Sequence, residues 1–319
     1  MRKWPKKSLS DSIHQPVMVK QVIESLSSCP DGIFVDATIG AGGHSREVIK
    51  IFGNKFEYIG FDLDSIVLKK AASRLAEYGP ETKLIKSNFA DIAVHLKSEK
   101  IPHISAALYD LGIGSFQIDD PERGFSYLND GPLGMSFDDT RKYSASDLIA
   151  NSSEKELFIL FRTLGQERKA KSLAKAIKNY PERITTTGQL AQIIRSVAGD
   201  KYFIKTASRV FQAIRIEVNA EFENISRSLE SVIPLLAVGG RALVITYHSL
   251  EDGLVKRIFK KYSGKCVCPP GMPECRCGAQ KLIRLVFSKP VVPDSDEVNS
   301  NPRARSAKLR VVERIEAAA

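Results

Sequence analysis

Short apolar runs alternate with amphipathic stretches along the first third of the chain. The apolar runs predict strands over 33–36, 58–62, 83–87 and 104–110. Between these runs, apolar residues recur with helical spacing and predict three helices, centred near Val48, Leu68 and Leu96. Strands that are separated by helices are typical of a parallel sheet with helices on both faces. This part of the sequence therefore predicts an α/β fold.

The alternation stops near residue 117, where a long helical region begins. Amphipathic helices are predicted over 155–164, 169–179 and 187–198. Strand patterns return only later, over 241–247, 282–287 and 309–312. A helical block between two strands is most simply an inserted domain at the carboxyl edge of the sheet, although its helices could instead pack on the sheet faces. We expect a disordered basic arm over 1–12, a discontinuous sheet domain over 13–116 and 216–319, and an all-helical insert over 117–215.

The first predicted strand ends at a carboxylate and continues into a glycine turn. Asp36 closes the apolar run, and the turn that follows contains Gly40, Gly42 and Gly43. Glycine allows the backbone to approach a ligand closely and to adopt positive φ. A strand, a glycine turn and a helix in this order are typical of a nucleotide-type crevice. A purely structural turn in another kind of α/β protein is the alternative.

A second carboxylate narrows the choice of ligand. Asp62 follows the second predicted strand, 22 residues after Gly40, close to the spacing at which an acid reaches ribose hydroxyls. The dinucleotide motif G-x-G-x-x-G/A is incomplete, because Ser45 occupies its third small position. Asp36 would also attract the cationic amino and sulfonium groups of S-adenosylmethionine, and it would repel a diphosphate. The sequence therefore favours S-adenosylmethionine over NAD.

Two further strand ends supply candidate side chains. Asp110 ends the fourth strand and would face a methyl donor, where a carboxylate could hold the N–H of an exocyclic amine during methyl transfer. It could equally serve only as a cofactor contact. Phe89 follows the third strand, where it could pack on an adenine ring or belong to the core.

Composition restricts the class of protein. The chain contains 43% hydrophobic and 26% charged residues, as is usual for globular proteins. It has no apolar run of the roughly 20 residues that cross a bilayer. Its basic N-terminus lacks the apolar region of a secretory signal. We therefore expect a cytoplasmic protein with no membrane partner.

The formal net charge of +10 is concentrated near the C-terminus. Residues 253–310 contain 13 Lys or Arg and 4 Asp or Glu, so their balance is 13 − 4 = +9. Concentrated basic charge is typical of a surface that binds a polyanion. The leading candidates for phosphate contacts are Arg303, Arg305, Lys308 and Arg310. Alternatively, this run anchors the last strand by pairing with acids such as Asp64 or Glu313.

Four of the five cysteines are closely spaced. Two C-x-C pairs flank a proline-rich loop and comprise Cys266, Cys268, Cys275 and Cys277. Four thiolates on one loop could surround a tetrahedral Zn²⁺, although C-x-x-C is the usual spacing. Free thiols and oxidised thiols are the alternatives. Neither these cysteines nor Cys29 follow a strand end near the glycine turn, so we expect no cysteine nucleophile.

Seven stretches occur in the order found in one protein family. They lie at 14–18 (HQPVM), 36–45 (DATIGAGGHS), 119–126 (DDPERGFS), 130–133 (DGPL), 211–219 (FQAIRIEVN), 248–252 (HSLED) and 301–310 (NPRARSAKLR). Over nearly its whole length after the N-terminal arm, the chain resembles the bacterial 16S rRNA cytosine-N4 methyltransferases (RsmH, formerly MraW). The resemblance implies a Rossmann-like methyltransferase domain with a helical insert. It also implies S-adenosylmethionine as the cofactor, and as acceptor the N4 amine of a cytosine in the decoding region (P site) of 16S rRNA.

The resemblance also assigns site residues. Carried over by position, the cofactor contacts are Gly42, Gly43, His44, Asp62, Phe89, Asp110 and Gln117. Among these, Asp110 is the candidate catalytic residue, whereas His44 and Gln117 rest on the resemblance alone. The cysteine loop is similar to an insert found in part of the family, so we expect no catalytic role for it. The expected partner is 16S rRNA within the small ribosomal subunit, and a homodimer is left open.

The chain departs from the family pattern at two places near the expected substrate. After Asp110 the family usually has L-G-V-S-S-P-Q, and here Gly114 and Phe116 replace the first Ser and the Pro. Farther along, the Asp, Arg and Met of the usual D-G-P-L-D-M-R-M are replaced by Gly134, Ser136 and Phe137. One rival function is therefore a ribosome-assembly factor with weakened catalysis. A second rival is a methyltransferase that acts on a protein or a small molecule.

Overall fold

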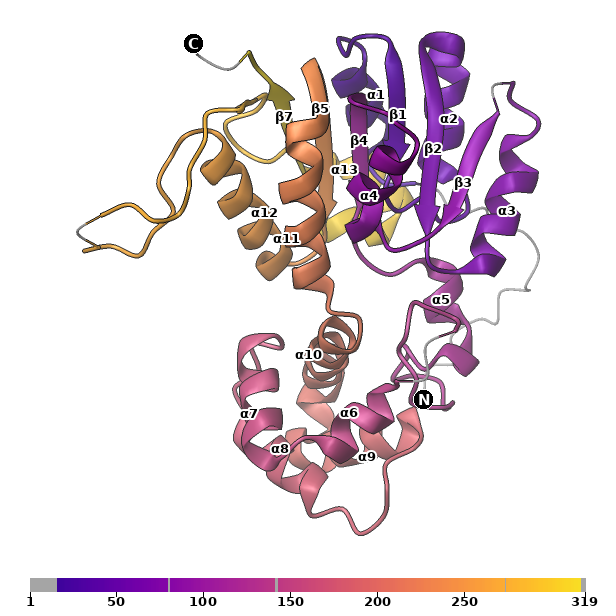
Figure 1. Cartoon of the computed structure of the whole chain (residues 1–319). Coiled ribbons are helices and arrows are strands. Elements are labelled where there is room, and N and C mark those ends of the chain that lie inside the picture. The colour runs from indigo at the N-terminus through magenta and orange to yellow at the C-terminus, as the bar shows by residue number, and fades with distance from the viewer. Residues whose placement is uncertain (1–15, 80, 141–142, 273, 317–319) are drawn as a thin grey trace.

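A seven-stranded sheet forms the centre of the computed structural model, which describes residues 16–79, 81–140, 143–272 and 274–316 (Figure 1). The strands are β1 (Gly32–Asp36), β2 (Phe56–Asp62), β3 (Thr82–Lys86), β4 (Ile104–Asp110), β5 (Leu236–Thr246), β6 (Ile283–Leu285) and β7 (Lys308–Arg314). Their order is β3-β2-β1-β4-β5-β7-β6. Strands β1 to β5 are parallel to one another, β7 is antiparallel to β5, and β6 is antiparallel to β7. The predicted Rossmann-like α/β fold is confirmed, whereas the arm predicted over 1–12 lies outside the described residues.

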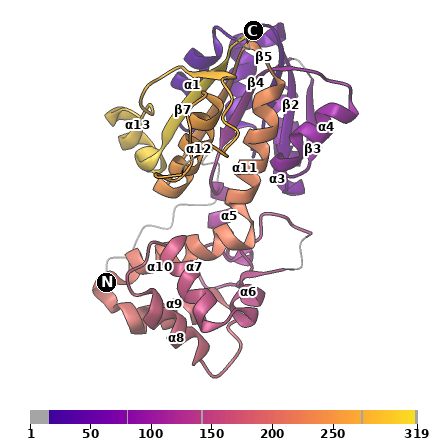
Figure 2. The same ribbon diagram turned by 60° about the vertical axis from the view of Figure 1, so that its left-hand side comes forward.

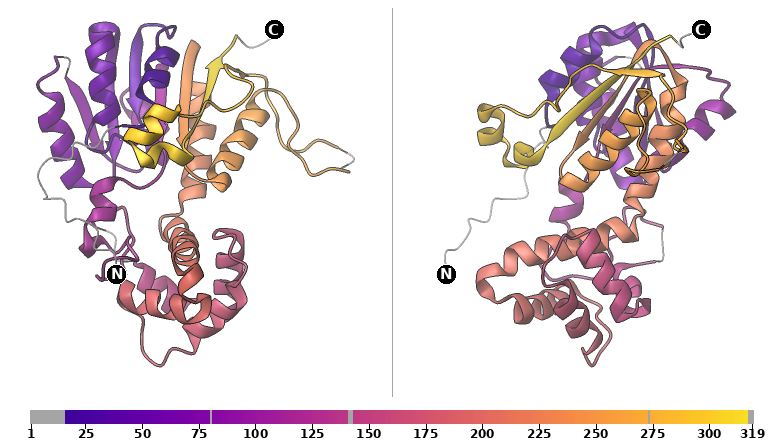
Figure 3. Two further views of the ribbon diagram at one scale, coloured as in Figure 1. Left: turned by 180° about the vertical axis from the view of Figure 1, so that it is seen from behind. Right: turned by 90° about the vertical axis from the view of Figure 1, so that its left-hand side faces the viewer.

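Helices bury both faces of the sheet. Successive side chains of each strand point to opposite faces, so each strand contributes to both apolar clusters. In β1, for example, Phe34 belongs to one apolar cluster and Val35 to the other. The Val35 face is covered by α4 (Ile92–Ser98), α11 (Glu221–Val232) and α12 (Ser249–Tyr262). The Phe34 face is covered by α1 (Val19–Leu26), α2 (Gly43–Phe52) and α3 (Ser65–Leu75). The short helix α13 (Ser295–Ser300) also lies on that side, as the view from behind shows (Figure 3).

A separate body of helices lies beyond the carboxyl ends of the parallel strands (Figures 1 and 2). It comprises α5 (Ser115–Asp119), α6 (Ala145–Asn151), α7 (Glu154–Thr163), α8 (Ala170–Lys178), α9 (Thr187–Ala198) and most of α10 (Asp200–Val218). The N-cap side chains of Ser144, Ser153 and Thr186 accept backbone N–H groups and begin α6, α7 and α9. The helix α10 passes through the boundary expected at residue 215 and leads into the sheet domain. No helix among the described residues is long and apolar enough to cross a membrane.

Several ion pairs link this helical body to the sheet domain, two of them near α3 and β3. Arg123 Nη2 lies 3.0 Å from Asp64 Oδ2, and Asp64 is also the N-cap of α3. Lys86 Nζ donates to Asp139 Oδ1 at 2.6 Å. Hydrogen bonds from Lys86 and Ser65 lower the pKa of Asp139 to about 2, so this carboxylate stays ionised at neutral pH. The insert is therefore fixed close to the carboxyl ends of the strands.

Candidate active site

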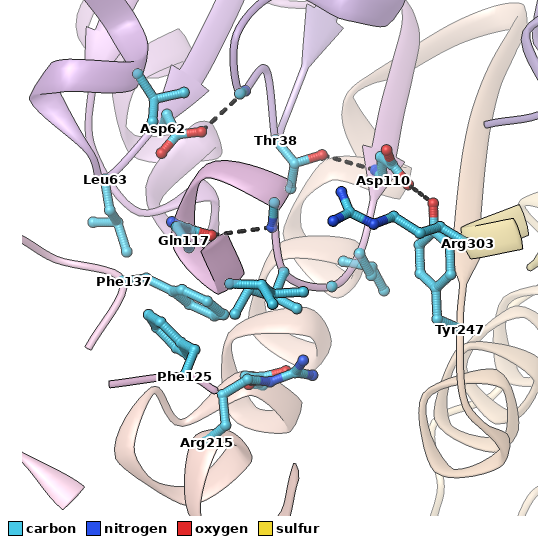
Figure 4. A pocket seen from close by; sticks show the side chains of 18 of the residues that line it. Thr38, Asp62, Leu63, Asp110, Gln117, Phe125, Phe137, Arg215, Tyr247 and Arg303 are labelled. Carbon is cyan, nitrogen blue, oxygen red and sulfur yellow. Dashed lines mark hydrogen bonds and ion pairs between the residues drawn. The ribbon is translucent and has the colours of Figure 1, made fainter. Parts of the chain in front are cut away.

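A cavity of about 570 Å³ lies between the carboxyl ends of the strands and the helical body. Its sheet side is formed by residues at or just after the ends of β1, β2 and β4, including Gly40, Asp62 and Asp110. Its other side includes Arg215 from α10 and Glu251 from α12. Figure 4 shows labelled side chains from both sides around it. Ligands of open parallel sheets bind at this edge, so the fold places the cavity where a cofactor is expected.

The glycine turn after β1 forms one wall together with Asp62. Gly40 adopts φ 52°, a left-handed conformation that glycine accommodates without strain. The Gly40 N–H donates to Asp62 Oδ2 at 3.0 Å, and the Asp64 N–H donates to Asp62 Oδ1 at 2.9 Å. Burial raises the pKa of Asp62 to about 6, although these hydrogen bonds oppose the shift. The carboxylate is therefore oriented by the backbone at the cavity wall.

Two residues at the glycine turn, Asp36 and Gly42, have structural roles outside the cavity wall. Asp36 and Gly42, both described by the structure, do not line the cavity. Asp36 is buried and accepts a hydrogen bond from Ser45 Oγ at 2.6 Å, and burial raises its pKa to about 6. A Cβ on Gly42 would lie 3.2 Å from Leu75 Cγ, so this glycine allows α2 and α3 to pack closely. Asp36 and Gly42 thus support the turn from behind.

Asp110 is held by three neighbours at the end of β4. Its N–H donates to Thr38 Oγ1 at 2.7 Å, and its Oδ1 accepts from Tyr247 Oη at 2.7 Å (Figure 4). Its Oδ2 lies 3.6 Å from His44 Nδ1. Burial and the adjacent Asp110 charge raise the pKa of Tyr247 well above its usual value, so the phenol stays a hydrogen-bond donor. Tyr247, Thr38 and His44 therefore fix the Asp110 side chain and backbone at the wall of the cavity.

The remaining sequence-predicted contacts also line the cavity. Phe89 begins a short turn of helix, and its ring meets the ring of Tyr109 edge-on at 6.0 Å. Gln117 Oε1 accepts from the Gly114 N–H at 3.1 Å, which fixes the start of α5. Gly43 and His44 lie at the start of α2 and also line the cavity. Six of the seven predicted cofactor positions are thus brought together.

A buried ion-pair network forms the opposite side of the cavity. Arg215 donates two hydrogen bonds to the Glu221 carboxylate, at 2.7 and 3.0 Å. Glu251 Oε1 lies 2.9 Å from His248 Nε2 and 3.9 Å from Arg215 Nη2. Burial disfavours the charge of Glu251, but His248 and Arg215 outweigh it and hold the pKa of Glu251 below its usual value. The network thus joins the end of α10 to the starts of α11 and α12.

Comparison with known proteins now identifies the family. The model of the MraW methylase family matches residues 11–315. The chain belongs to the MraW methylase family. Relatives named ribosomal RNA small subunit methyltransferase H occur in Clostridioides difficile (39% identical over 95% of this chain and 99% of theirs) and in Caldicellulosiruptor saccharolyticus (42% identical, with the same shares). A third, from Carboxydothermus hydrogenoformans, is 41% identical over 95% of this chain and 98% of its own.

Phe137, one of the residues expected to depart from the usual family pattern, helps to form the cavity. Phe137 stacks on Phe125 with ring centroids 5.4 Å apart, and both side chains line the cavity. The Phe137 N–H donates to Asn219 Oδ1 at 2.8 Å, and Asn219 Nδ2 donates to the Met135 carbonyl at 2.8 Å. The Asn219 side chain therefore ties this loop to the end of α10.

The basic C-terminal run divides into two groups. Arg310 donates to both carboxylate oxygens of Asp252, at 2.7 and 3.0 Å, and Lys308 Nζ lies 3.7 Å from the same carboxylate. These two side chains link β7 to α12, so for Lys308 and Arg310 the structure favours the alternative that the run anchors the last strand, with Asp252 as the acid. Arg303 and Arg305 are exposed, and Arg303 lines the cavity. Arg303 Nη2 lies 3.6 Å from Asp119 Oδ2, but both of these side chains are exposed to solvent.

Sequence reasoning missed Tyr247 and the ion-pair network of the MraW methylase. Tyr247 directly follows β5, so the strand-end argument that selected Asp110 would also have selected it. Arg215 and Glu251 lie within the motifs at 211–219 and 248–252, but each has helical neighbours that are typical of ordinary surface charges. The four clustered cysteines do not line the cavity.

Proposed function

We propose that this MraW methylase transfers a methyl group from S-adenosylmethionine to the N4 amine of a cytosine in the decoding region of 16S rRNA. The observation that supports the proposal best is the position of Asp110 between the two sides of the cavity. Asp110 lines the cavity, its Oδ1 accepts a hydrogen bond from Tyr247, and its Oδ2 lies 3.6 Å from His44 Nδ1. Membership of the family and the names of the relatives favour rRNA as the acceptor.

The sheet side of the cavity has groups that fit the cofactor. S-adenosylmethionine supplies a methyl group made electrophilic by its sulfonium. Asp62, oriented by Gly40, is suited to accept hydrogen bonds from ribose hydroxyls. Phe89 offers an apolar surface for the adenine ring. The two carboxylates on this side, Asp62 and Asp110, attract a cationic ligand such as S-adenosylmethionine and would repel a diphosphate.

Asp110 is the group that we assign to the acceptor amine. The lone pair of a cytosine amine is delocalised into the ring, so an oxygen that holds one N–H favours the pyramidal geometry needed for attack. Asp110 Oδ2 can accept that N–H, and later the proton, while Tyr247 and Thr38 keep the side chain and backbone in place. No covalent bond between the enzyme and the base is required.

The acceptor base has to leave its stack in order to reach this cavity. The candidate catalytic group lies at the end of β4, between the sheet and the helical body, and its side chain is only 19% exposed. Enzymes that modify a base within folded nucleic acid extrude it into such a recess. We propose that the small ribosomal subunit, in the cytoplasm, presents this base.

The decisive test is methyl transfer to purified small ribosomal subunits from cells that lack this enzyme. With labelled methyl donor, we expect label in 16S rRNA, and nucleoside mass spectrometry is expected to show N4-methylcytidine. Asp110→Asn in the same assay is the control for contaminating activity. Binding of the subunit without turnover would support the assembly-factor rival, and label in protein or in a small molecule would support the other rival.

A further inference from the structure

The four clustered cysteines come together on a loop that extends away from the body of the protein. This cysteine loop, residues 265–281, connects α12 to β6 and points away from the cavity (Figures 1 and 3). The four Sγ atoms of Cys266, Cys268, Cys275 and Cys277 all lie within 4.8 Å of one another. They come from two C-x-C pairs that face each other across the loop.

The distances match those of a tetrahedral zinc site. A zinc–sulfur bond is about 2.3 Å long, so sulfurs at the corners of a ZnS₄ tetrahedron lie about 3.8 Å apart. In the structure, Cys275 Sγ and Cys277 Sγ are 3.4 Å apart, and Cys277 Sγ and Cys266 Sγ are 4.0 Å apart. These two distances lie close to the tetrahedral value, and the four sulfurs, all within 4.8 Å of one another, need to move by less than about 1 Å to accept the ion.

Backbone N–H groups point at three of these sulfurs. The Cys268 N–H lies 3.4 Å from Cys266 Sγ, the Val267 N–H 3.5 Å from Cys277 Sγ, and the Arg276 N–H 3.4 Å from Cys268 Sγ. Such donors stabilise thiolates, and hydrogen bonds to the ligands are a regular feature of metal sites. The C-x-C spacing thus places a donor beside a sulfur on both arms of the loop.

The cysteine loop also lacks an apolar core of its own. None of the described residues between 265 and 281 is buried. A loop of this length has to offset the entropy of ordering its backbone, and metal binding supplies folding free energy in small domains without a core. Four zinc-bound thiolates carry a net charge of −2, and Lys265 and Arg276 directly precede Cys266 and Cys277 to balance it.

We propose that Cys266, Cys268, Cys275 and Cys277 bind one Zn²⁺ that orders the cysteine loop. The ligand set is complete with four thiolates and leaves no open coordination position, so the site is structural. Thiolate ligands favour Zn²⁺ over Mg²⁺ or Ca²⁺, which require oxygen ligands. This inference does not depend on the methyl acceptor, because the cysteine loop does not line the cavity.

Metal analysis of the full-length protein tests the proposal. Protein purified under reducing conditions is expected to contain about one zinc ion per chain, and a Cys266→Ser/Cys275→Ser variant is expected to contain almost none. Cys29→Ala is the matched control, because Cys29 is buried beside α1 and should leave the zinc content unchanged. With Co²⁺ in place of zinc, we expect thiolate charge-transfer bands and the absorption of a tetrahedral ion.

A second readout shows whether the metal orders the loop. Trypsin is expected to cleave after Lys265, Arg276 or Lys281 much faster once a chelator has removed the zinc. Circular dichroism should stay unchanged, since the loop lies outside the sheet. Reactive thiols at all four cysteines without bound metal would overturn the proposal, as would disulfides among them in protein purified with reductant.

Discussion

The two sides of the cavity are built in different ways. The side on which we propose that the cofactor binds, called the cofactor side below, takes Asp62 and Asp110 from the ends of β2 and β4, the two strands that flank β1, and their positions follow directly from the order of the sheet. The opposite side, on which we propose that the acceptor base enters and which we call the acceptor side, takes Arg215, Glu221 and Glu251 from three helices, and their meeting depends on how those helices cross. Parallel topology constrains strand ends far more tightly than it constrains helix positions, so the first set is predictable from sequence and the second is not.

The two sides also differ in how their charges are compensated. Asp62 accepts backbone N–H groups and, among the described residues, forms no ion pair, and burial raises its pKa to about 6. On the acceptor side, Arg215 lies between two buried carboxylates. Isolated carboxylates are suited to ligand binding, whereas a closed network holds helices in place. We therefore expect mutations on the cofactor side to affect binding and rate, and those on the acceptor side to affect folding first.

The largest effect is expected for Asp110→Asn, because Asp110 stands where the two sides meet. An amide keeps the shape but cannot take a proton from the amine, so the methylation rate should fall by about 10²–10⁴-fold. Affinity for S-adenosylmethionine should change by only a few-fold. Single-turnover methylation and calorimetric binding separate these quantities, and Asp31→Asn, an exposed acid before β1, is the control. Equal losses in rate and affinity would make Asp110 a cofactor ligand only.

Arg215→Ala is expected to reduce stability strongly. Its removal leaves Glu221 and Glu251 buried near each other without their shared cation, which typically costs about 3–5 kcal/mol. Chemical denaturation measures the loss. Lys83→Ala, which breaks an ion pair with Glu99 in which the Lys83 side chain is exposed, is the control and should cost at most about 1 kcal/mol. Similar losses in the two variants would show that the network does not hold the helices.

Asp62→Ala is expected to weaken the cofactor complex without unfolding the protein. When the ribose hydroxyls lack their hydrogen-bond acceptor, the binding free energy of the cofactor weakens by about 1–3 kcal/mol. This loss corresponds to a dissociation constant about 5- to 150-fold higher. Calorimetry with S-adenosylmethionine measures the change, and denaturation should show a folded variant. Unchanged affinity in the folded variant would remove Asp62 from the site.

The same contrast explains how far the sequence could predict the molecule. Apolar runs ending at Asp36, Asp62 and Asp110 predicted the strands and their shared edge, because a short continuous apolar run followed by a turn is a local property of the sequence. The pairing of Arg310 with Asp252 was not predictable, since it depends on β7 entering antiparallel to β5 and beside α12. The spacing of the cysteines was visible, but only the path of the loop brings their sulfurs together.

The smallest effect is expected at the edge of the cavity, in the basic run. Arg303 and Arg305 are exposed, and Arg303 lines the cavity, so both can meet phosphates on either side of an extruded base. Each phosphate contact that is lost should lower the salt dependence of RNA affinity by about 0.7 in slope for single-stranded RNA. Arg303→Ala/Arg305→Ala should therefore show a slope lower by about 1.4, twice the value for one contact, with normal folding and cofactor binding.

Arg310→Ala is the control, because Arg310 is paired with Asp252 and only 12% exposed, so its loss should reduce stability but leave the slope unchanged. A wild-type slope in the double variant would mean that the run is structural, and the RNA surface would then have to be sought on the helical body.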